Sequence, residues 1–137
     1  MYAVVVNPNP GDVVINEIFA DPSPQVGLPN AEFVELYNTS NNAFDLSNWQ
    51  FINTTTVKTL PSFILAPNAY VILCDNGDTA AYSSYGDVIG VSSFSALTNG
   101  GDSLTLTDNS SNVLDIVAYD ISWYQDAVSY THLRAHE

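Results

Sequence analysis

The stretch that decides the fold class runs from residue 99 to residue 119 and reads NGGDSLTLTDNSSNVLDIVAY. Two of its apolar residues, Leu104 and Leu106, alternate with hydroxyl side chains, which is the period of a β-strand with one buried face. Small polar residues and glycines at 99–102 and 109–112 are typical of turns. The stretch therefore predicts two strands, at 103–107 and 113–119, with Leu104 and Leu106 directed into a core.

Strand patterns continue on both sides of this stretch at regular intervals. We expect strands at residues 3–6, 13–20, 32–37, 49–53, 63–65 and 70–74, separated by turns rich in proline, asparagine and aspartate. A short helical turn is predicted only at 79–86. Asn, Ser and Thr take the place of the Lys, Glu and Arg that helix surfaces favour. The chain is therefore predicted to be all-β, with the layout of a β-sandwich.

The charge balance is strongly acidic, because 15 Asp and Glu residues stand against 2 Lys and Arg residues and give a formal net charge of −13. Such a surface cannot neutralise a phosphate backbone, which excludes nucleic-acid binding. Anionic membrane surfaces repel it as well. No apolar run approaches about 18 residues, so no membrane insertion is expected. The acidic surface is typical of an extracellular protein, and it equally serves simple solubility.

Cys74 is the only cysteine, so no internal disulfide and no cysteine-based metal site is expected. It lies in the apolar run at residues 70–74. We predict a buried structural thiol rather than a nucleophile.

No catalytic constellation is predicted. Both histidines, His132 and His136, lie near the C-terminus, beyond the strand pattern, so a Ser-His or Cys-His arrangement has no base. Glu17, Glu32 and Glu35 could supply a carboxylate pair. Glycoside hydrolysis by such a pair needs a deep cleft, for which a domain of this size has little room. We therefore predict that the chain is not an enzyme.

Short motifs occur in a fixed order along the chain. They read VINEI at 14–18, EFVEL at 32–36, DLS at 45–47, YVIL at 70–73, NGGDSLTL at 99–106 and VLDIV at 113–117. In this order they resemble the lamin tail domain family, in its bacterial secreted branch. The resemblance implies an immunoglobulin-like β-sandwich that serves as an interaction or anchoring module and has no catalytic residues. It also implies Trp49 as a core anchor between the sheets and Gly101 as a turn residue with positive φ.

The composition of the first residues and the same resemblance together set the expected domain boundaries. Residues 1–10 are expected to be a linker or the end of a preceding domain, because prolines and a glycine cluster at 8–11. Residues 11–127 are expected to form the lamin-tail-like sandwich. Residues 128–137 are expected to be a non-native tail, since the family continues there into a further strand. A sandwich without that strand has an open sheet edge, so edge-strand self-association is expected.

Three carboxylates, Glu17, Asp21 and Glu35, are the candidate metal ligands. We expect Asn16 and Ile18 to face the core, which turns Glu17 outward together with Ile15 and Phe19. If the strand at 13–20 pairs with the strand at 32–37, Glu17 and Glu35 lie close on one face, where like charges repel. A Ca²⁺ ion would remove that repulsion, with Asp21 as a third ligand. The alternative is a pair of solvated carboxylates that point apart.

Two further features are typical of ligand binding but have simpler interpretations. Residues 75–78 and 99–102 contain Asp, Asn and Gly, yet they lack the spacing of an EF-hand and are predicted to be turns. An aromatic set in or near predicted loops either stacks on sugar rings or fills the sandwich. Its members are Tyr2, Tyr82, Tyr85, Tyr124 and Tyr130.

The predicted function is a non-catalytic interaction or anchoring module of a larger secreted or cell-surface bacterial protein. Its partner is expected to be a protein or a cell-surface component. The alternative is an accessory domain that binds calcium or carbohydrate and serves a neighbouring hydrolase. No cofactor is required, and Ca²⁺ is the one candidate.

Overall fold

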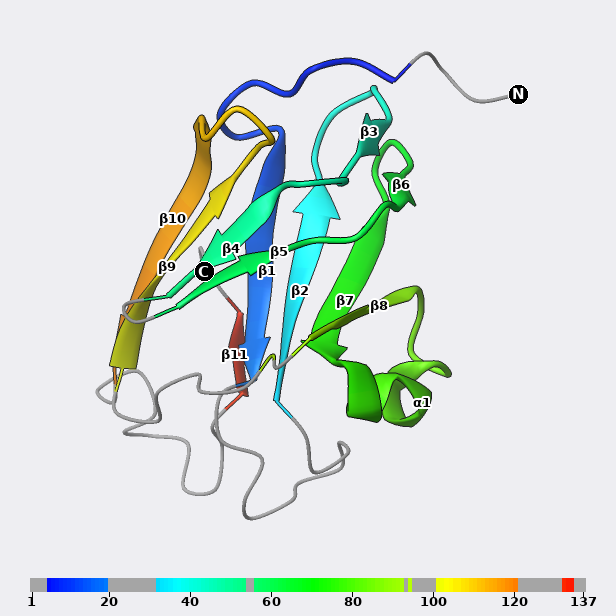
Figure 1. Ribbon diagram of the computed structural model, residues 1–137, viewed down its shortest axis with the longest axis vertical. Coiled ribbons are helices and arrows are strands. Elements are labelled where there is room, and N and C mark those ends of the chain that lie inside the picture. The colour runs from blue at the N-terminus through cyan, green and yellow to red at the C-terminus, as the bar shows by residue number, and fades with distance from the viewer. Residues whose placement is uncertain are drawn as a thin grey trace.

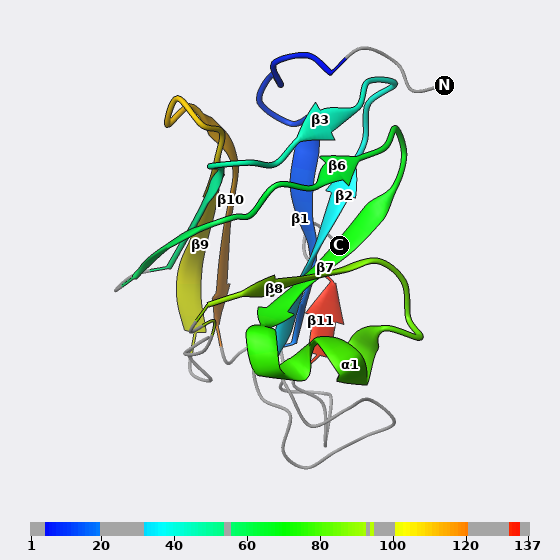
Figure 2. The same cartoon turned by 45° about the vertical axis from the view of Figure 1, so that its right-hand side comes forward.

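Figure 1 shows the computed structural model of the chain as two facing β-sheets with one short helix. The structure describes residues 5–19, 32–53, 56–92, 94, 101–120 and 132–134. The two layers separate clearly in Figure 2, where β9 and β10 lie on one side and β1, β2 and β7 on the other. This arrangement confirms the predicted all-β sandwich.

The first sheet has five strands in the order β11-β1-β2-β7-β8. Their bounds are β1 Val13–Phe19, β2 Phe33–Asn38, β7 Tyr70–Asp75, β8 Val88–Val91 and β11 His132–Arg134. Neighbouring strands are antiparallel except β7 and β8, which are parallel. The parallel pair requires a crossover connection, and the short helical segment lies within it.

The second sheet has four antiparallel strands in the order β10-β9-β4-β5. Their bounds are β4 Gln50–Ile52, β5 Val57–Thr59, β9 Gly101–Thr107 and β10 Val113–Asp120. Two short strands, β3 (Phe44–Asp45) and β6 (Ile64–Leu65), pair at one end of the sandwich. The strands expected at 103–107 and 113–119 are thus confirmed as the antiparallel pair β9 and β10.

The predicted helical turn is present but begins earlier than expected. A 3-10 turn, η1 (Asn76–Asp78), leads directly into α1 (Thr79–Tyr82). The Asp75 side chain accepts a hydrogen bond from the backbone N–H of Gly77 at 3.0 Å, which is an N-terminal cap. This cap fixes the point at which the chain leaves β7 and turns over the sheet.

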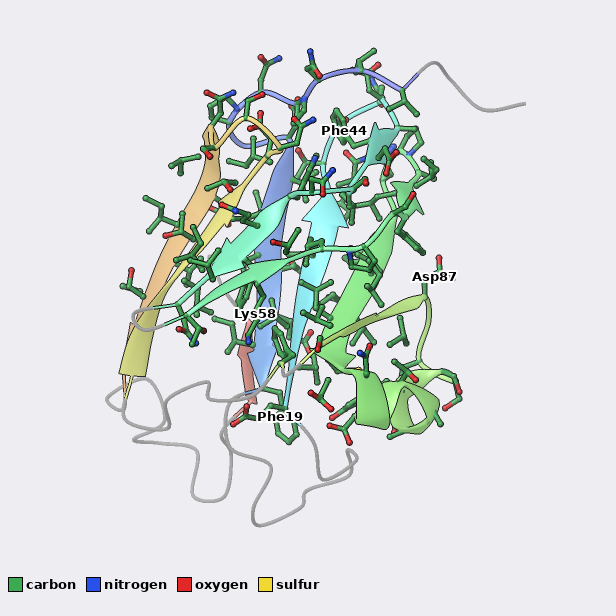
Figure 3. The ribbon with its side chains drawn as sticks, in the orientation of Figure 1. Phe19, Phe44, Lys58 and Asp87 are labelled. Carbon is green, nitrogen blue, oxygen red and sulfur yellow. The ribbon has the colours of Figure 1, made fainter. Side chains whose placement is uncertain are left out.

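The main core lies between the two sheets. It is built from aliphatic and aromatic side chains of both layers, among them Ile15, Leu36, Leu73, Leu104 and Leu106, all fully buried. Each such side chain contributes roughly 1.5–3 kcal/mol of hydrophobic stabilisation. Figure 3 shows Phe44, a member of this core, near one end of the sandwich, whereas Phe19 near the other end belongs to a separate apolar cluster.

A β-bulge in β1 decides which of its side chains face the core. The register between β1 and β2 shifts between Ile15 and Glu17, so Asn16 is the extra residue. Ile15 and Ile18 both lie fully buried in the main core, whereas Asn16 and Glu17 are only partly buried. The expected inward position of Asn16 and outward position of Ile15 are therefore both wrong, because a bulge interrupts the two-residue period. Glu17 lies on the outer side, as expected.

A second β-bulge lies in β10, at the place where hydrogen bonds join the two sheets. It falls between Val113 and Asp115 and places Asp115 beside β1. The Asp115 Oδ2 atom accepts a hydrogen bond from the backbone N–H of Ile15 at 2.7 Å. The backbone N–H of Gly11 donates to the Leu114 carbonyl at 2.9 Å. β11 pairs with residues 17–19, at one end of β1. The bonds to Asp115 and Leu114 connect the other end of β1, and Gly11 just before it, to the opposite sheet.

The turn between β9 and β10 lies at the predicted position and is organised by Asp108. Its carboxylate accepts hydrogen bonds from the backbone N–H groups of Ser110 at 2.8 Å and Asn112 at 2.9 Å, and from the Asn112 Nδ2 at 3.0 Å. Burial acts to raise the pKa of Asp108, but the hydrogen bonds from Asn112 and Ser110 outweigh it and hold the pKa below its ordinary value of 3.8.

We expect Asp108 to make stability depend on pH in the acid range. Its folded-state pKa lies below that of the unfolded chain, so its stabilisation is complete above about pH 5 and is lost as pH falls through the folded-state pKa. Denaturant unfolding of wild type and the Asp108→Asn variant, from neutral to strongly acid pH, should show a stability difference that shrinks below about pH 4. A difference that is constant with pH would contradict this role.

The predicted domain boundaries near residues 10 and 127 stay predictions. Residues 121–131 and 135–137 lie outside the described residues. Within the predicted tail, the backbone of 132–134 forms β11, which pairs with β1 so that Arg134 stands opposite Glu17. At the other end, Val5 makes an isolated parallel bridge with Ala43.

Candidate binding site on the outer sheet face

The side of the five-stranded sheet that points away from the main core is called the outer face here. The strand register places its side chains in rows across β1, β2 and β7. The rows are Val14, Tyr37 and Tyr70, then Glu17, Glu35 and Ile72, and then Phe19 and Phe33. The outer face therefore brings aromatic rings and carboxylates together on a rigid sheet.

A second, smaller apolar cluster covers one end of the outer face. It contains Phe19, Phe33, Ile72, Cys74 and Tyr82, of which Tyr82 comes from α1. The rings of Phe33 and Tyr82 meet edge to face with centroids 5.0 Å apart. Tyr82 is 1% exposed, so α1 is anchored on the sheet by an aromatic side chain.

Gly90 allows this close packing of the helical segment. A Cβ atom at Gly90 of β8 would overlap the Asn76 side-chain oxygen and would lie 3.0 Å from Thr79 Cγ2 and 3.2 Å from Asn76 Cα. The absence of a side chain therefore lets η1 and α1 lie directly against β8. The position of α1 over the outer face is fixed as a result.

A small pocket lies between α1 and the carboxylates of the outer face. Its volume is about 110 Å³, and it is lined by Glu17, Phe33, Glu35, Ile72, Tyr82 and Tyr85. Tyr85 follows α1, packs edge to face on Tyr82 with centroids 5.7 Å apart, and is 52% exposed. The pocket thus has an aromatic wall that is open to solvent and a floor that carries two carboxylates.

The two candidate metal ligands on β1 and β2 are neighbours. Glu17 stands directly opposite Glu35 in the antiparallel pair, and Asn16 Nδ2 donates to Glu35 Oε1 at 2.8 Å. The third candidate, Asp21, lies outside the described residues. Within the described residues, no three His, Cys, Asp or Glu side chains gather in a group suited to a metal ion.

Two tyrosines that sequence reasoning did not select form a stacked pair next to the pocket. Tyr37 and Tyr70 lie opposite each other on β2 and β7, with ring centroids 4.4 Å apart and planes inclined by 19°. Tyr70 is 47% exposed. The pair extends the aromatic part of the outer face beyond the carboxylates.

The other predicted site residues fall in different places. Trp49 is 2% exposed in the main core, with its ring centroid 6.0 Å from that of Phe44. The turn predicted at 99–102 is wrong for its second half, because Gly101 and Asp102 begin β9; residues 99–100 lie outside the described residues. Of the predicted aromatic set, Tyr82 and Tyr85 line the pocket. The remaining members, Tyr2, Tyr124 and Tyr130, lie outside the described residues.

A larger hollow of about 300 Å³ lies at the opposite end of the sandwich, between residues 5–8 and the segment Asp45–Trp49. One of its walls is the N-terminal segment, whose backbone attachments are the Val5–Ala43 bridge and a 3.4 Å bond from the Val6 N–H to the Ala43 carbonyl. The site on the outer face is built on strands and a helix instead. A rigid frame of that kind suits recognition better.

Cys74 lies in the second cluster and is fully buried, as predicted. Burial raises the pKa of the Cys74 thiol to about 11, and the nearby carboxylates of Asp78 and Asp75 act in the same direction. The thiolate, which is the reactive form, is therefore scarce at neutral pH.

We expect the Cys74 thiol to be inert in the native protein. Wild type treated with a thiol reagent at about pH 8 should react at a rate set by unfolding, and in concentrated urea it should react completely within minutes. Mass spectrometry of timed samples measures both rates. Fast labelling without denaturant would contradict the burial of this side chain.

Comparison with known proteins agrees with this description. A family model described as Lamin Tail Domain matches residues 7–120, which is well over half of the chain. No curated protein matches the chain significantly. Among the described residues, no helix has the length and apolar character that a membrane span requires.

Proposed function

Since the chain belongs to the lamin tail domain family, a non-enzymatic family of immunoglobulin-like interaction domains, we propose that it docks a partner protein on the outer face of its five-stranded sheet. The observation that carries the proposal is the pocket beside α1, flanked by Tyr85 and by the stacked pair of Tyr37 and Tyr70. Half-exposed tyrosines on a rigid frame are typical anchors of protein interfaces.

The proposal includes the setting of this module. We place it in a larger bacterial protein that is secreted or held at the cell surface. The acidic, lysine-poor composition supports this setting, because it suits a medium rich in divalent cations. Fractionation of the producing cells, with an antibody against the module, should detect the parent protein in the envelope or the medium. Detection in the cytoplasm alone would contradict it.

The test of docking compares two altered surfaces of the same chain. The first variant, Tyr70→Ser with Tyr85→Ser, removes two exposed rings of the outer face. The second, Val57→Ser with Ile116→Ser, alters exposed side chains of the opposite sheet, where Val57 and Ile116 are 55% and 57% exposed. Immobilised wild type and both variants are offered the same envelope and medium fractions, and captured proteins are quantified by mass spectrometry.

We expect wild type and the variant of the opposite sheet to retain the same partner, and the outer-face variant to lose it. Removal of two aromatic anchors should weaken binding at least about tenfold, since each exceeds about 1 kcal/mol at a typical interface. If both variants retain the partner equally, or if wild type retains nothing specific, the outer face is not the docking surface.

The second candidate function is calcium or carbohydrate binding by an accessory domain. The juxtaposition of Glu17 and Glu35 favours calcium, because a cation would relieve their repulsion. In that case Ca²⁺ at about 100 times its Kd should raise stability by about 2.7 kcal/mol, and Glu35→Gln should abolish the effect. An unchanged melting temperature in Ca²⁺ removes this candidate. For carbohydrate, a glycan array without signal does the same.

Self-association through a sheet edge also stays a prediction. Among the described strands, β11 and β8 stand at the ends of one sheet, and β10 and β5 stand at the ends of the other. Lys58 of β5 stands opposite the core residue Phe51 and is partly buried, and an inward-directed charge of this kind discourages edge pairing (Figure 3). We therefore expect pairing at an end strand other than β5. Light scattering that shows a monomer at all concentrations would contradict it.

A further inference from the structure

We propose that the pocket of the outer face receives one lysine or arginine side chain of the partner protein. This inference rests on the proposed docking function and names the chemistry that the pocket recognises. Four observations carry it: the opposed carboxylates, the aromatic wall, the size of the pocket and the charge of the whole chain.

The carboxylates define the sign of the ligand. Glu17 and Glu35 stand opposite each other, and side chains at opposed positions have Cβ atoms about 4.5–5.5 Å apart. Asn16 donates one hydrogen bond to Glu35, and both carboxylates line the pocket. A cationic group between the two would be attracted by both.

The remaining lining defines the shape of the ligand. Phe33, Ile72 and Tyr82 supply apolar surface, and Tyr85 presents a ring that is 52% exposed at the rim. Lysine and arginine have long apolar stems that pack on such surface while the charged head reaches polar partners. The head is also attracted to the face of an aromatic ring within about 6 Å. A bare metal ion would leave this apolar lining unused.

The size of the pocket distinguishes a side chain from other cations. A volume of about 110 Å³ has room for roughly three or four water molecules, since each occupies about 30 Å³ in the liquid. A guanidinium group has four heavy atoms and fits this space. Ca²⁺ takes 6–8 oxygen ligands, so it would need all four carboxylate oxygens and both tyrosine hydroxyls of the described lining to reach the lower number.

The net charge of the chain favours a basic protein as the source of that side chain. A formal charge of −13 attracts basic surfaces and accelerates their association. The same charge repels nucleic acids and anionic membranes, so a basic segment of a protein remains the matching partner. Specific seating of one side chain in the pocket then adds to this general attraction.

The test uses capped pentapeptides with four glycines around one central residue. The central residue is arginine, lysine or citrulline, which has the shape of arginine without its charge. Each peptide is titrated into the ¹⁵N-labelled full chain, and the Kd follows from amide shifts. We expect arginine and lysine to shift the amides of Glu35, Ile72 and Tyr85 most, and citrulline to bind at least about tenfold more weakly than arginine.

Two variants that each remove one negative charge separate the pocket from the general field. Glu35→Gln alters the pocket and keeps an acceptor for Asn16, whereas Asp87→Asn alters an exposed loop residue, labelled in Figure 3, that does not line the pocket. Circular dichroism verifies that both are folded. We expect Glu35→Gln to weaken the arginine peptide about fivefold and Asp87→Asn less than about twofold, as for a partly exposed ion pair.

Equal effects of the two variants, equal binding of arginine and citrulline, or no binding of the arginine peptide would each overturn the inference. These outcomes are distinct from a failure of the docking function. If partner capture is lost with Tyr70→Ser and Tyr85→Ser but persists in Glu35→Gln, the outer face docks the partner without a cationic anchor. If capture is unaffected by all of these changes, the docking function itself fails.

Discussion

Replacing Asn38 with alanine should lower the free energy of unfolding by about 3 kcal/mol, because this fully buried side chain satisfies several backbone groups at once. Its Nδ2 donates to the backbone carbonyls of Asn42 at 2.7 Å, Ala66 at 3.0 Å and Leu65 at 3.2 Å. Its Oδ1 accepts from the backbone N–H of Ser40 at 2.9 Å and from the Ser40 hydroxyl at 2.8 Å. Alanine removes all five of these hydrogen bonds, one of which is buried and four of which are partly buried.

Denaturant unfolding monitored by Trp49 fluorescence measures the loss, and Asn41→Ala is the matched control. Asn41 belongs to the same turn but is exposed, so its replacement should change stability by less than about 0.5 kcal/mol. A loss below about 1 kcal/mol in Asn38→Ala would mean that water replaces the amide in the turn.

The second large effect is expected at Asp115, where alanine should cost about 2 kcal/mol. The carboxylate accepts a 2.7 Å hydrogen bond from the Ile15 N–H across the two sheets. Hydrogen bonds to charged groups contribute about 1.5–3 kcal/mol, more than neutral ones. The variant Asp115→Asn keeps an acceptor oxygen without the charge and should lose roughly half as much.

Hydrogen exchange of the Ile15 amide gives an independent readout for Asp115. Alanine should accelerate exchange of this amide more than that of Leu36, which lies in the adjacent strand. Equal losses of stability in the alanine and asparagine variants, with Ile15 still protected, would show that the acceptor does not join the sheets.

The sequence pattern predicted most of the fold because the central strands alternate or form apolar runs. Leu104 and Leu106 are fully buried on β9, as their alternation with threonine requires. Four strands were not predicted: β3 (Phe44–Asp45), β5 (Val57–Thr59), β8 (Val88–Val91) and β11 (His132–Arg134). All four have only two to four residues, too few to show the period of a buried strand, and β5, β8 and β11 stand at the ends of their sheets.

The orientation of β1 could be predicted only in part. Counting alternate positions back from Ile18 directs Asn16 inward, but the bulge at Asn16 resets the count, so that Ile15 is inward instead. A bulge depends on the pairing partner and leaves no mark in the hydrophobic period of one strand. The outward position of Glu17 was predictable because it lies on the same side of the bulge as Ile18.

The binding site was predicted in fragments. Glu17 and Glu35 were singled out for their charge, and Tyr82 and Tyr85 for their aromatic rings, but nothing in the sequence connects the two pairs. The structure brings them together because α1 folds back over the sheet beside Gly90. The stacked pair of Tyr37 and Tyr70 was missed, although both occupy outward positions of strands that proved to be neighbours.

Photo-crosslinking in the producing cells tests the central claim most directly, because it captures the partner in place, whatever its identity. Benzoylphenylalanine is placed in the protein at Tyr85 on the outer face, or at Ile116 on the opposite sheet; both side chains are more than half exposed. A docking module of the proposed kind gives a discrete crosslinked partner from position 85 and none from position 116. A partner crosslinked from position 116 alone, or from neither position, would contradict it.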